Sequence, residues 1–309
     1  MLNLGLIAAA IISSLLGMTT QSFIVIVHLV DHLKGRLLSP VDQILLSLGI
    51  VRLCFEVFSL VDAFFIILFQ NVFPLPVMIF LYLIVNASNL SNIWLTTVFS
   101  VIFCLKIANF HNAFFLRLKN GLSQQVVRLI IGSILLSICY MSLFLWVDSY
   151  LNPPKQLRSH GKNETEYLTH VFIFVAMGNS FPFIIYSSST ILLIASLFLH
   201  MKQMKSNSNV TASLDTYYKA IKFMSFCLLC FLLLLATNVV ILYYYKSLNA
   251  IALFIIWHVF PTLHSIYLIY RTNKLRECFL RILPCRTNCQ VNGRRSELES
   301  RNQLETIRR

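Results

Sequence analysis

Long uncharged apolar segments recur along the whole sequence, and they constrain the fold more than any other feature. A membrane-spanning helix needs about 20 apolar residues to cross roughly 30 Å of hydrocarbon. Of the 309 residues, 57% are hydrophobic and only 12% are charged, whereas soluble domains carry about 25% charged residues. We therefore predict an integral membrane protein. Its seven spans are placed at 4–30, 44–69, 77–105, 126–147, 171–199, 221–245 and 249–270.

The apolar segments are continuous and do not alternate with polar residues. Only helices and closed β-barrels satisfy backbone hydrogen bonds in lipid, and barrel strands alternate. The fold class predicted is therefore all-α, a seven-transmembrane helix bundle. The first span lacks a basic segment before it, so we expect it to be a membrane helix and not a cleaved signal peptide.

Basic residues are distributed unequally between the two sides of the predicted membrane. Of the 25 Lys and Arg residues, 20 fall in the segments after spans one, three and five and in the C-terminal tail, and 4 fall in the alternate segments. Because cytoplasmic loops carry the excess of positive charge, the N-terminus is predicted to be extracellular and the C-terminus cytosolic. The net charge of +13 favours contact with anionic lipid and a cytosolic partner, and makes no case for nucleic acid.

Glycosylation and cysteine positions agree with this orientation. Asn163, in the sequence "NET", lies in the longest predicted external segment, 148–170, and is a predicted glycosylation site. No cysteine falls in an external segment, so an extracellular disulfide is not expected. The first five of the eight cysteines are interpreted as small apolar packing residues, and the three at or beyond the end of the last span are candidates for reversible palmitoylation. They are Cys278, Cys285 and Cys289.

Charged residues inside span two need partners. Arg52 and Glu56 are four residues apart and share one helix face. An arginine at mid-membrane costs about 2.5–3.5 kcal/mol on insertion scales, so it is expected to face the bundle. Glu56 is the nearest candidate partner, with Gln21 and Ser265 as others. The group is either a switch between helix arrangements or a fixed structural contact, and the two roles are compatible.

Polar residues gather at the predicted outer end of span three. Asn86, Asn89 and Asn92 fall on nearly one face, and Trp94 follows them. Membrane amides can simply hydrogen-bond neighbouring helices. The alternative is a mostly apolar cavity with a few polar groups, which is what a small-molecule site needs. Candidate contacts from span seven are Phe254, Trp257 and His258.

No reactive constellation is found in the sequence. There is no Cys/His cluster with zinc spacing, no Gly-rich phosphate loop and no Ser-His-Asp set, so we expect no enzyme, no metal and no cofactor. Pro182 and Pro261 lie inside spans five and seven and can kink their helices. Kinks are consistent with moving parts, although static kinks are common.

Several separated segments carry a resemblance to a known family. They are "SPVDQILLSLGIVRL" (39–53), "NIWLTTVFSVIFCLKIANF" (92–110), "LLIASLFLHMKQM" (192–204) and "HSIYLIYRTNKLRECFL" (264–280). On these segments the chain resembles the bitter taste receptors, the type 2 family of G-protein-coupled receptors, over most of residues 20–282. The Asp-Arg-Tyr and Asn-Pro-x-x-Tyr motifs of rhodopsin-like receptors are missing.

The resemblance implies a receptor of the plasma membrane, with the ciliary membrane as a second location left open. Small, largely apolar bitter agonists would bind in the outer half of the bundle, where Val85 stands at a position that some relatives fill with Trp. A gustducin-type heterotrimeric G protein would then signal through phospholipase C and calcium. A receptor oligomer is a further partner left open.

The resemblance also assigns roles to polar residues. Arg52, His264 and Ser265 stand on family motifs of the activation switch, while Gln21 replaces the family's usual Asn. The G protein would meet basic residues at the cytosolic ends of the helices. They are Lys106, Arg117, Lys119, His200, Lys202, Lys205, Lys219, Lys222 and Lys274.

Beyond the seventh span, an amphipathic interfacial helix is predicted near 272–283, ending before Pro284. The receptor domain is thus 1–283, and 284–309 is a charged cytosolic tail predicted to be disordered. Two other functions stay open. One is a non-gustatory chemosensory receptor for bile acids or steroids. The other is a transporter or channel, which the absence of repeats disfavours.

Overall fold

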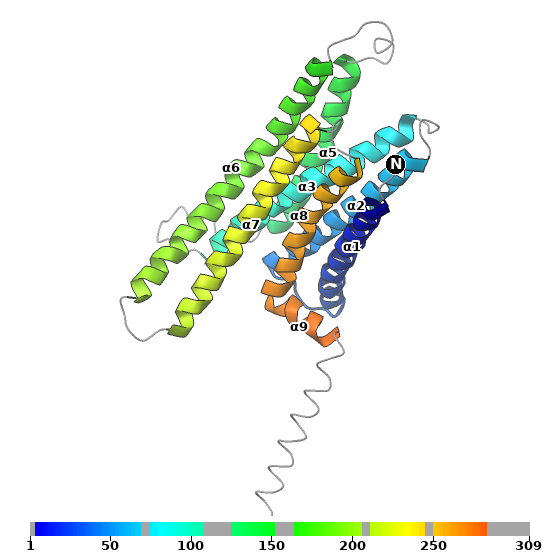
Figure 1. Cartoon of the computed structure of the whole chain (residues 1–309). Coiled ribbons are helices and arrows are strands. Elements are labelled where there is room, and N and C mark those ends of the chain that lie inside the picture. The colour runs from blue at the N-terminus through cyan, green and yellow to red at the C-terminus, as the bar shows by residue number, and fades with distance from the viewer. Residues whose placement is uncertain are drawn as a thin grey trace, which may run out of the picture. The chain divides into compact units, whose positions relative to one another are not determined.

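Helices form the regular secondary structure of the chain wherever the structure describes it (Figure 1). The computed structural model describes residues 4–68, 75–107, 121, 125–151, 164–205, 211–244 and 250–282. It divides into two units, Met1–Ser265 and Ile266–Arg309, which are described separately below. The helices are α1 (Leu4–Leu33), α2 (Pro40–Leu68), α3 (Leu75–Ile107), α5 (Val126–Leu151), α6 (Glu164–Lys205), α7 (Thr211–Tyr244), α8 (Ala250–Arg271) and α9 (Asn273–Ile282).

The all-α prediction is confirmed, and each of the seven predicted spans falls, to within a residue, inside one helix. Within the described part of the chain, six helices have the length and composition of membrane spans, with mean hydropathies between 1.7 and 2.4. The 22 residues of α8 also exceed the roughly 20 needed. Large apolar side chains face outward along the bundle, such as Ile184, which is 62% exposed. Such surfaces are stable in lipid, so the chain is a multi-pass membrane protein.

Local sequence signals define the short connection between α1 and α2. Gly35 adopts a left-handed φ of 73°, and its N–H donates to the carbonyl of His32 while that of Arg36 donates to the carbonyl of Asp31. This is a glycine-terminated helix end. Ser39 then caps α2, because its hydroxyl accepts the Asp42 N–H at 3.2 Å, with Pro40 as the first helical residue.

Helix α3 lies at the centre of the first unit and packs against α2, α5 and α6. Helix α1 packs on α2, and α6 runs beside α7 (Figure 1). A buried cluster joins α3, α6 and α7, where the ring of Tyr186 stacks on Phe231 with centroids 4.1 Å apart, beside Ile93 and Leu234. This arrangement fixes one face of α3 toward the interior.

Among the described residues, the second unit contains the last six residues of α8 and the amphipathic helix α9. Its range, Asn273–Ile282, agrees with the helix predicted near 272–283. Leu275 is buried, whereas Phe279 and Ile282 are exposed. A face of exposed apolar residues suits an interfacial helix, and its place at the membrane surface stays a prediction.

Candidate ligand cavity and buried polar network

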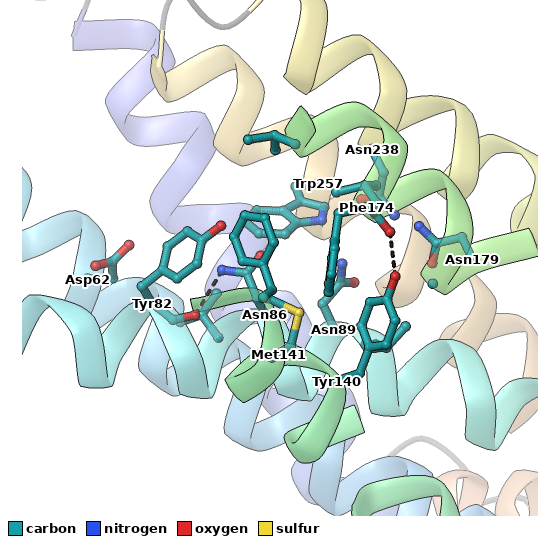
Figure 2. A pocket seen from close by; sticks show the side chains of 16 residues that line it. Asp62, Tyr82, Asn86, Asn89, Tyr140, Met141, Phe174, Asn179, Asn238 and Trp257 are labelled. Atoms are coloured by element: carbon teal, nitrogen blue, oxygen red, sulfur yellow. Dashed lines mark hydrogen bonds between the residues drawn. The ribbon is translucent and has the colours of Figure 1, made fainter. Parts of the chain in front are cut away.

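A cavity of about 310 Å³ opens at one end of the first unit (Figure 2). Helices α2, α3, α5, α6, α7 and α8 all contribute to its walls. The lining residues are Asp62, Tyr82, Val85, Asn86, Asn89, Leu90, Tyr140, Met141, Phe144, Val171, Phe174, Val175, Gly178, Asn179, Asn238 and Trp257. Aliphatic and aromatic residues dominate this set, with four amides and one carboxyl group. This is the composition of a small-molecule site.

An aromatic wall formed by α5 and α6 is held by one hydrogen bond. The Tyr140 hydroxyl donates to the Phe174 carbonyl at 2.7 Å, and the two rings lie 4.4 Å apart. Gly178 makes room for this ring, because a Cβ at that position would lie 2.8 Å from Tyr140 Cε1. The wall therefore depends on a glycine that the tyrosine ring covers.

Two polar groups at the cavity have no protein partner within the described residues. The Trp257 Nε1 and the Asn179 Oδ1 are both buried from solvent and unpaired there. Both side chains lie at the cavity in Figure 2. A buried unpaired polar group costs about 1–3 kcal/mol. A ligand that accepts from Trp257 and donates to Asn179 would recover this free energy.

Below the cavity, Arg52 is the centre of a dense network of hydrogen bonds. It is only 4% exposed, and its Nε donates to Asn92 Oδ1 at 2.7 Å. Its Nη1 donates to Ser265 Oγ at 2.6 Å and to His264 Nδ1 at 3.1 Å. Gln21 Nε2 donates to the same Ser265 Oγ at 2.8 Å. The network thus ties α1, α2, α3 and α8 together at one level.

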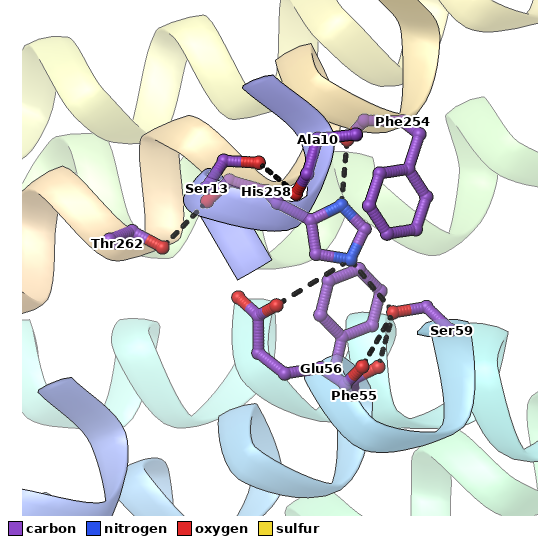
Figure 3. A network of polar contacts seen from close by, with 8 residues as sticks. All are labelled: Ala10, Ser13, Phe55, Glu56, Ser59, Phe254, His258 and Thr262. Carbon is purple, nitrogen blue, oxygen red and sulfur yellow. Dashed lines mark hydrogen bonds and ion pairs between the residues drawn. The ribbon is translucent and has the colours of Figure 1, made fainter. Parts of the chain in front are cut away.

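Of the three candidate partners of Arg52, Ser265 is hydrogen-bonded to it, Gln21 is joined to it through Ser265, and Glu56, the nearest candidate, is not hydrogen-bonded to it. The Glu56 Oε2 lies 3.7 Å from His258 Nε2 instead (Figure 3). Sharing a helix face did not decide the pairing, because the long arginine side chain extends to acceptors on α3 and α8. Glu56 fits against α1 at Gly17, where a Cβ would lie 2.5 Å from Glu56 Oε1.

His258 joins this acidic group to the backbone and to α2. Its Nδ1 lies 2.7 Å from the Phe254 carbonyl, so Nδ1 carries the proton. Its Nε2 lies 2.7 Å from Ser59 Oγ. The Phe55 ring stacks on His258 at 5.0 Å and meets the edge of Trp257 at 5.2 Å. Trp257 therefore touches both the cavity and the buried network.

The predicted ligand contacts divide between these two places. Val85, Asn86, Asn89 and Trp257 line the cavity. Asn92, Phe254 and His258 belong to the network, and Trp94 is not among the lining residues. The expectation of one amide face at the cavity is wrong for Asn92, because three residues along a helix are about 4.5 Å deeper in the bundle.

The two prolines lie buried inside their helices, where their carbonyls accept hydrogen bonds from α3 and α2. Thr97 Oγ1 donates to the Pro182 carbonyl at 3.3 Å, and Arg52 Nη1 lies 3.5 Å from the Pro261 carbonyl. Sequence reasoning expected the site between the third, fifth, sixth and seventh spans but named no residue of α5, α6 or α7, such as Tyr140, Asn179 and Asn238. The two amides had a signal, since each is a lone amide in an apolar span.

The predicted G-protein contacts that the structure describes in the first unit lie at the opposite helix ends from the cavity. Lys106 ends α3, Lys202 is near the end of α6, and Lys219 and Lys222 are near the start of α7; all four are exposed, and His200 is half-buried. Lys205 belongs to α6, and Lys274 to α9 in the second unit. Arg117, Lys119, Asn163, Cys285 and Cys289 lie outside the described residues, while Cys278 is a half-buried free thiol of α9.

A bundle of membrane-spanning helices with a cavity of this composition is compatible with a helical membrane receptor. The family model "Taste receptor protein (TAS2R)" matches residues 1–287. The chain is 31% identical over 287 residues to taste receptor type 2 member 8 of Gorilla gorilla gorilla, which covers 88% of this chain and 93% of that protein. Its identity to taste receptor type 2 member 9 of Homo sapiens is 31% over 291 residues, or 87% and 89% of the two chains.

A rodent relative agrees, since taste receptor type 2 member 125 of Rattus norvegicus is 30% identical over 295 residues, or 91% of this chain and 94% of that protein. The chain belongs to the type 2 taste receptor family. It is therefore a G-protein-coupled receptor of the bitter taste class and not an enzyme.

Proposed function

We propose that the chain is a plasma-membrane receptor that binds small, largely apolar bitter compounds in the cavity at its extracellular end. The observation that carries this proposal is the cavity itself, about 310 Å³ with aromatic walls and unpaired polar groups at Trp257 and Asn179. The predicted orientation places this end outside the cell, because the exposed lysines lie at the other end. Asn89 and Trp257 are the ligand contacts proposed from α3 and α8.

Trp257 is the proposed link between ligand and activation. A ligand that moves the indole also moves Phe55, whose ring contacts both Trp257 and His258. His258 faces Glu56, and the neighbouring Arg52 network joins four helices. An agonist shifts the equilibrium only by binding the active arrangement more tightly than the inactive one. In this proposal, the shift to the active arrangement changes the ligand contacts and the buried network together.

The proposed output is a heterotrimeric G protein of the gustducin type, acting through phospholipase C and calcium. Lys106, Lys202 and Lys222 are exposed at the predicted cytosolic ends of α3, α6 and α7. A partner with acidic and apolar groups would complement these ends. Anionic headgroups of the cytosolic leaflet would meet the same residues when no G protein is bound.

The test is guanine-nucleotide exchange by a purified gustducin-type G protein, with the full-length receptor in lipid nanodiscs. The panel contains bitter compounds and, as a second arm, bile acids and steroids. Saturable exchange with a bitter compound, lost in a Trp257→Ala variant of normal abundance, is the expected result. Exchange stimulated only by bile acids or steroids would show that these compounds, and not bitter compounds, are the ligand class. Exchange by no compound, with folded receptor confirmed, would contradict the proposal.

A further inference from the structure

A second pocket of about 180 Å³ lies between α6 and α7. Its walls are mainly apolar. From α6 they include Phe172, Ala176, Ser180 and Phe183, and from α7 Leu235 and Val239. None of these six residues lines the cavity described above, so the second pocket is a separate space and not an extension of the same lining.

The two pockets share Val175 and Asn179, which line both. Both residues belong to α6, so one stretch of this helix separates the two spaces. The shared Asn179 is also the residue whose buried Oδ1 has no partner within the described residues. In Figure 2 its amide lies at the edge of the main cavity opposite Asp62. A polar group that reaches this amide therefore stands at the boundary between the pockets.

The second pocket opens toward the outer surface of the bundle. Ala176, Ser180 and Val239 on its rim are exposed. All three belong to the membrane spans His170–Lys202 and Tyr218–Val240. An opening on the outward face of two such apolar segments is expected to meet lipid, so the pocket suits an apolar chain and does not suit a charged group.

We propose that the second pocket is a subsite of the ligand site, reached past Asn179, which takes the alkyl chain of an elongated amphipathic ligand. This inference rests on the proposed function of the main cavity. The ligand class has an aromatic head for the wall at Tyr140, a central amide or hydroxyl for Asn179, and an apolar tail for the α6–α7 subsite. The main cavity binds the aromatic head. Because the subsite binds the tail, affinity is expected to rise with the length of the alkyl chain.

The test compares N-ethylbenzamide with N-hexylbenzamide, which share an aromatic ring and an amide and differ only in the chain. Tritiated compounds are bound to the full-length receptor in nanodiscs, binding to empty nanodiscs is subtracted, and Kd values refer to the free aqueous concentration. Each buried methylene contributes about fourfold in affinity. The hexyl compound has four more methylenes and is therefore expected to bind up to about 250-fold more tightly than the ethyl compound.

Two variants fill the subsite from opposite walls, and each has a neighbour as its control. Val239→Trp on α7 is paired with Val240→Trp. Val239 is 41% exposed and Val240 is 38% exposed. Ala176→Trp on α6 is paired with Met177→Trp, and both positions are exposed. Val240 and Met177 line neither pocket. The subsite variants are expected to abolish the advantage of the hexyl chain and leave N-ethylbenzamide binding unchanged, whereas the controls retain the advantage.

Equal Kd values for the two benzamides in the unmodified receptor would overturn the subsite while leaving the main cavity as a ligand site. A hexyl advantage that survives in both Val239→Trp and Ala176→Trp would also overturn it, since the chain would then be bound elsewhere. Binding of neither benzamide, together with agonist-stimulated nucleotide exchange by other compounds, would overturn the subsite and preserve the proposed function. Binding of neither compound without any stimulated exchange would overturn both.

Discussion

Asn89 and Asn92 are the same residue type on the same helix, three positions apart, yet their surroundings differ. Asn92 is buried and accepts a 2.7 Å hydrogen bond from Arg52 Nε. Asn89 is half-buried at the wall of the cavity. The Asn92 amide belongs to the hydrogen-bond network that holds α2 on α3, and the Asn89 amide faces the cavity. Depth along the axis of this helix therefore separates an amide that is hydrogen-bonded to Arg52 from an amide that lines the cavity.

The same contrast holds for the whole regions around these two residues. Around Arg52, donors and acceptors of four helices meet at distances of 2.6–2.8 Å. Around the cavity, Trp257 Nε1 and Asn179 Oδ1 remain unpaired within the described residues. The network also contains unpaired buried atoms, Gln21 Oε1 and His264 Nε2, but its central charged donor, Arg52, has short hydrogen bonds that make the local structure rigid and specific. At the cavity no such centre is present among the described residues, and its unpaired groups are costly until something binds them. Substitutions in the two regions should consequently change different measured quantities.

The largest effect is expected for Arg52→Leu, which removes the centre of the network. The loss of two short hydrogen bonds to a charged group outweighs the relief of burying that charge, and we expect destabilisation by about 3 kcal/mol. The measurement is thermal unfolding in detergent with a thiol-reactive dye. Cys104, Cys227 and Cys230 are buried free thiols and would react on unfolding.

Arg52→Lys is the matched variant, since it keeps the charge and loses the planar fork that reaches α3 and α8 together. Its unfolding temperature should lie between those of the unmodified receptor and Arg52→Leu. An Arg52→Leu receptor that unfolds at the temperature of the unmodified protein would show that the network contributes little to stability.

A smaller loss is expected for Gly17→Ala, which tests the close approach of α1 to Glu56. The added Cβ would lie 2.5 Å from Glu56 Oε1 and 3.0 Å from Thr262 Oγ1. Something must shift, and such overpacking costs about 2 kcal/mol. Gly132→Ala on α5 is the control, because nothing lies within 4 Å of its added Cβ. Equal unfolding temperatures for the two variants would show that Glu56 has room to move.

Asn92→Ala and Asn89→Ala form a crossed pair that tests the comparison most directly. Asn92→Ala leaves Arg52 Nε without its acceptor, so we expect about 1.5 kcal/mol of destabilisation. Asn89→Ala should leave the unfolding temperature unchanged and raise the agonist concentration for half-maximal exchange about tenfold. The opposite result, in which only Asn92→Ala changes potency at unchanged stability, would reverse the roles assigned here.

The smallest effect is expected for Tyr140→Phe, which keeps the ring and removes the hydrogen bond to the Phe174 carbonyl. One neutral hydrogen bond contributes about 1 kcal/mol, so agonist potency should fall about fivefold or less. Tyr150→Phe, at an exposed position of the same helix, serves as the control. Potency equal in both variants would mean that the aromatic wall is held by packing alone.

Much of the fold could be predicted because one physical requirement dominates it. Lipid demands long apolar helices, so the spans were found from apolar length alone. Apolar length does not locate the end of a helix that extends beyond the apolar region. Helix α6 has 42 residues and α7 has 34, both longer than the spans 171–199 and 221–245, because their polar ends carry no hydropathy signal.

The site was less predictable, because its residues come from six helices whose mutual rotation the sequence does not specify. Asn86 and Asn89 were found from clustering, and Trp257 from its position in span seven. Tyr140 and Phe174 look like ordinary apolar residues of a membrane helix. The pairing of Arg52 with Asn92 instead of Glu56 depends on the distance between α2 and α3. The spacing of residues within α2 gives no information about that distance.

The length of α6 has a mechanical consequence. From Pro182 to Lys205 the helix runs 23 residues, which is about 35 Å at 1.5 Å per residue. Pro182 lies within one turn of Asn179 at the cavity, and a proline weakens the helix locally by removing a hydrogen bond. A bend of about 10° at this point would swing the far end through an arc of about 6 Å. Bent in this way, the helix would act as a lever with a short arm at the cavity and a long arm ending in lysines, and it would amplify small displacements.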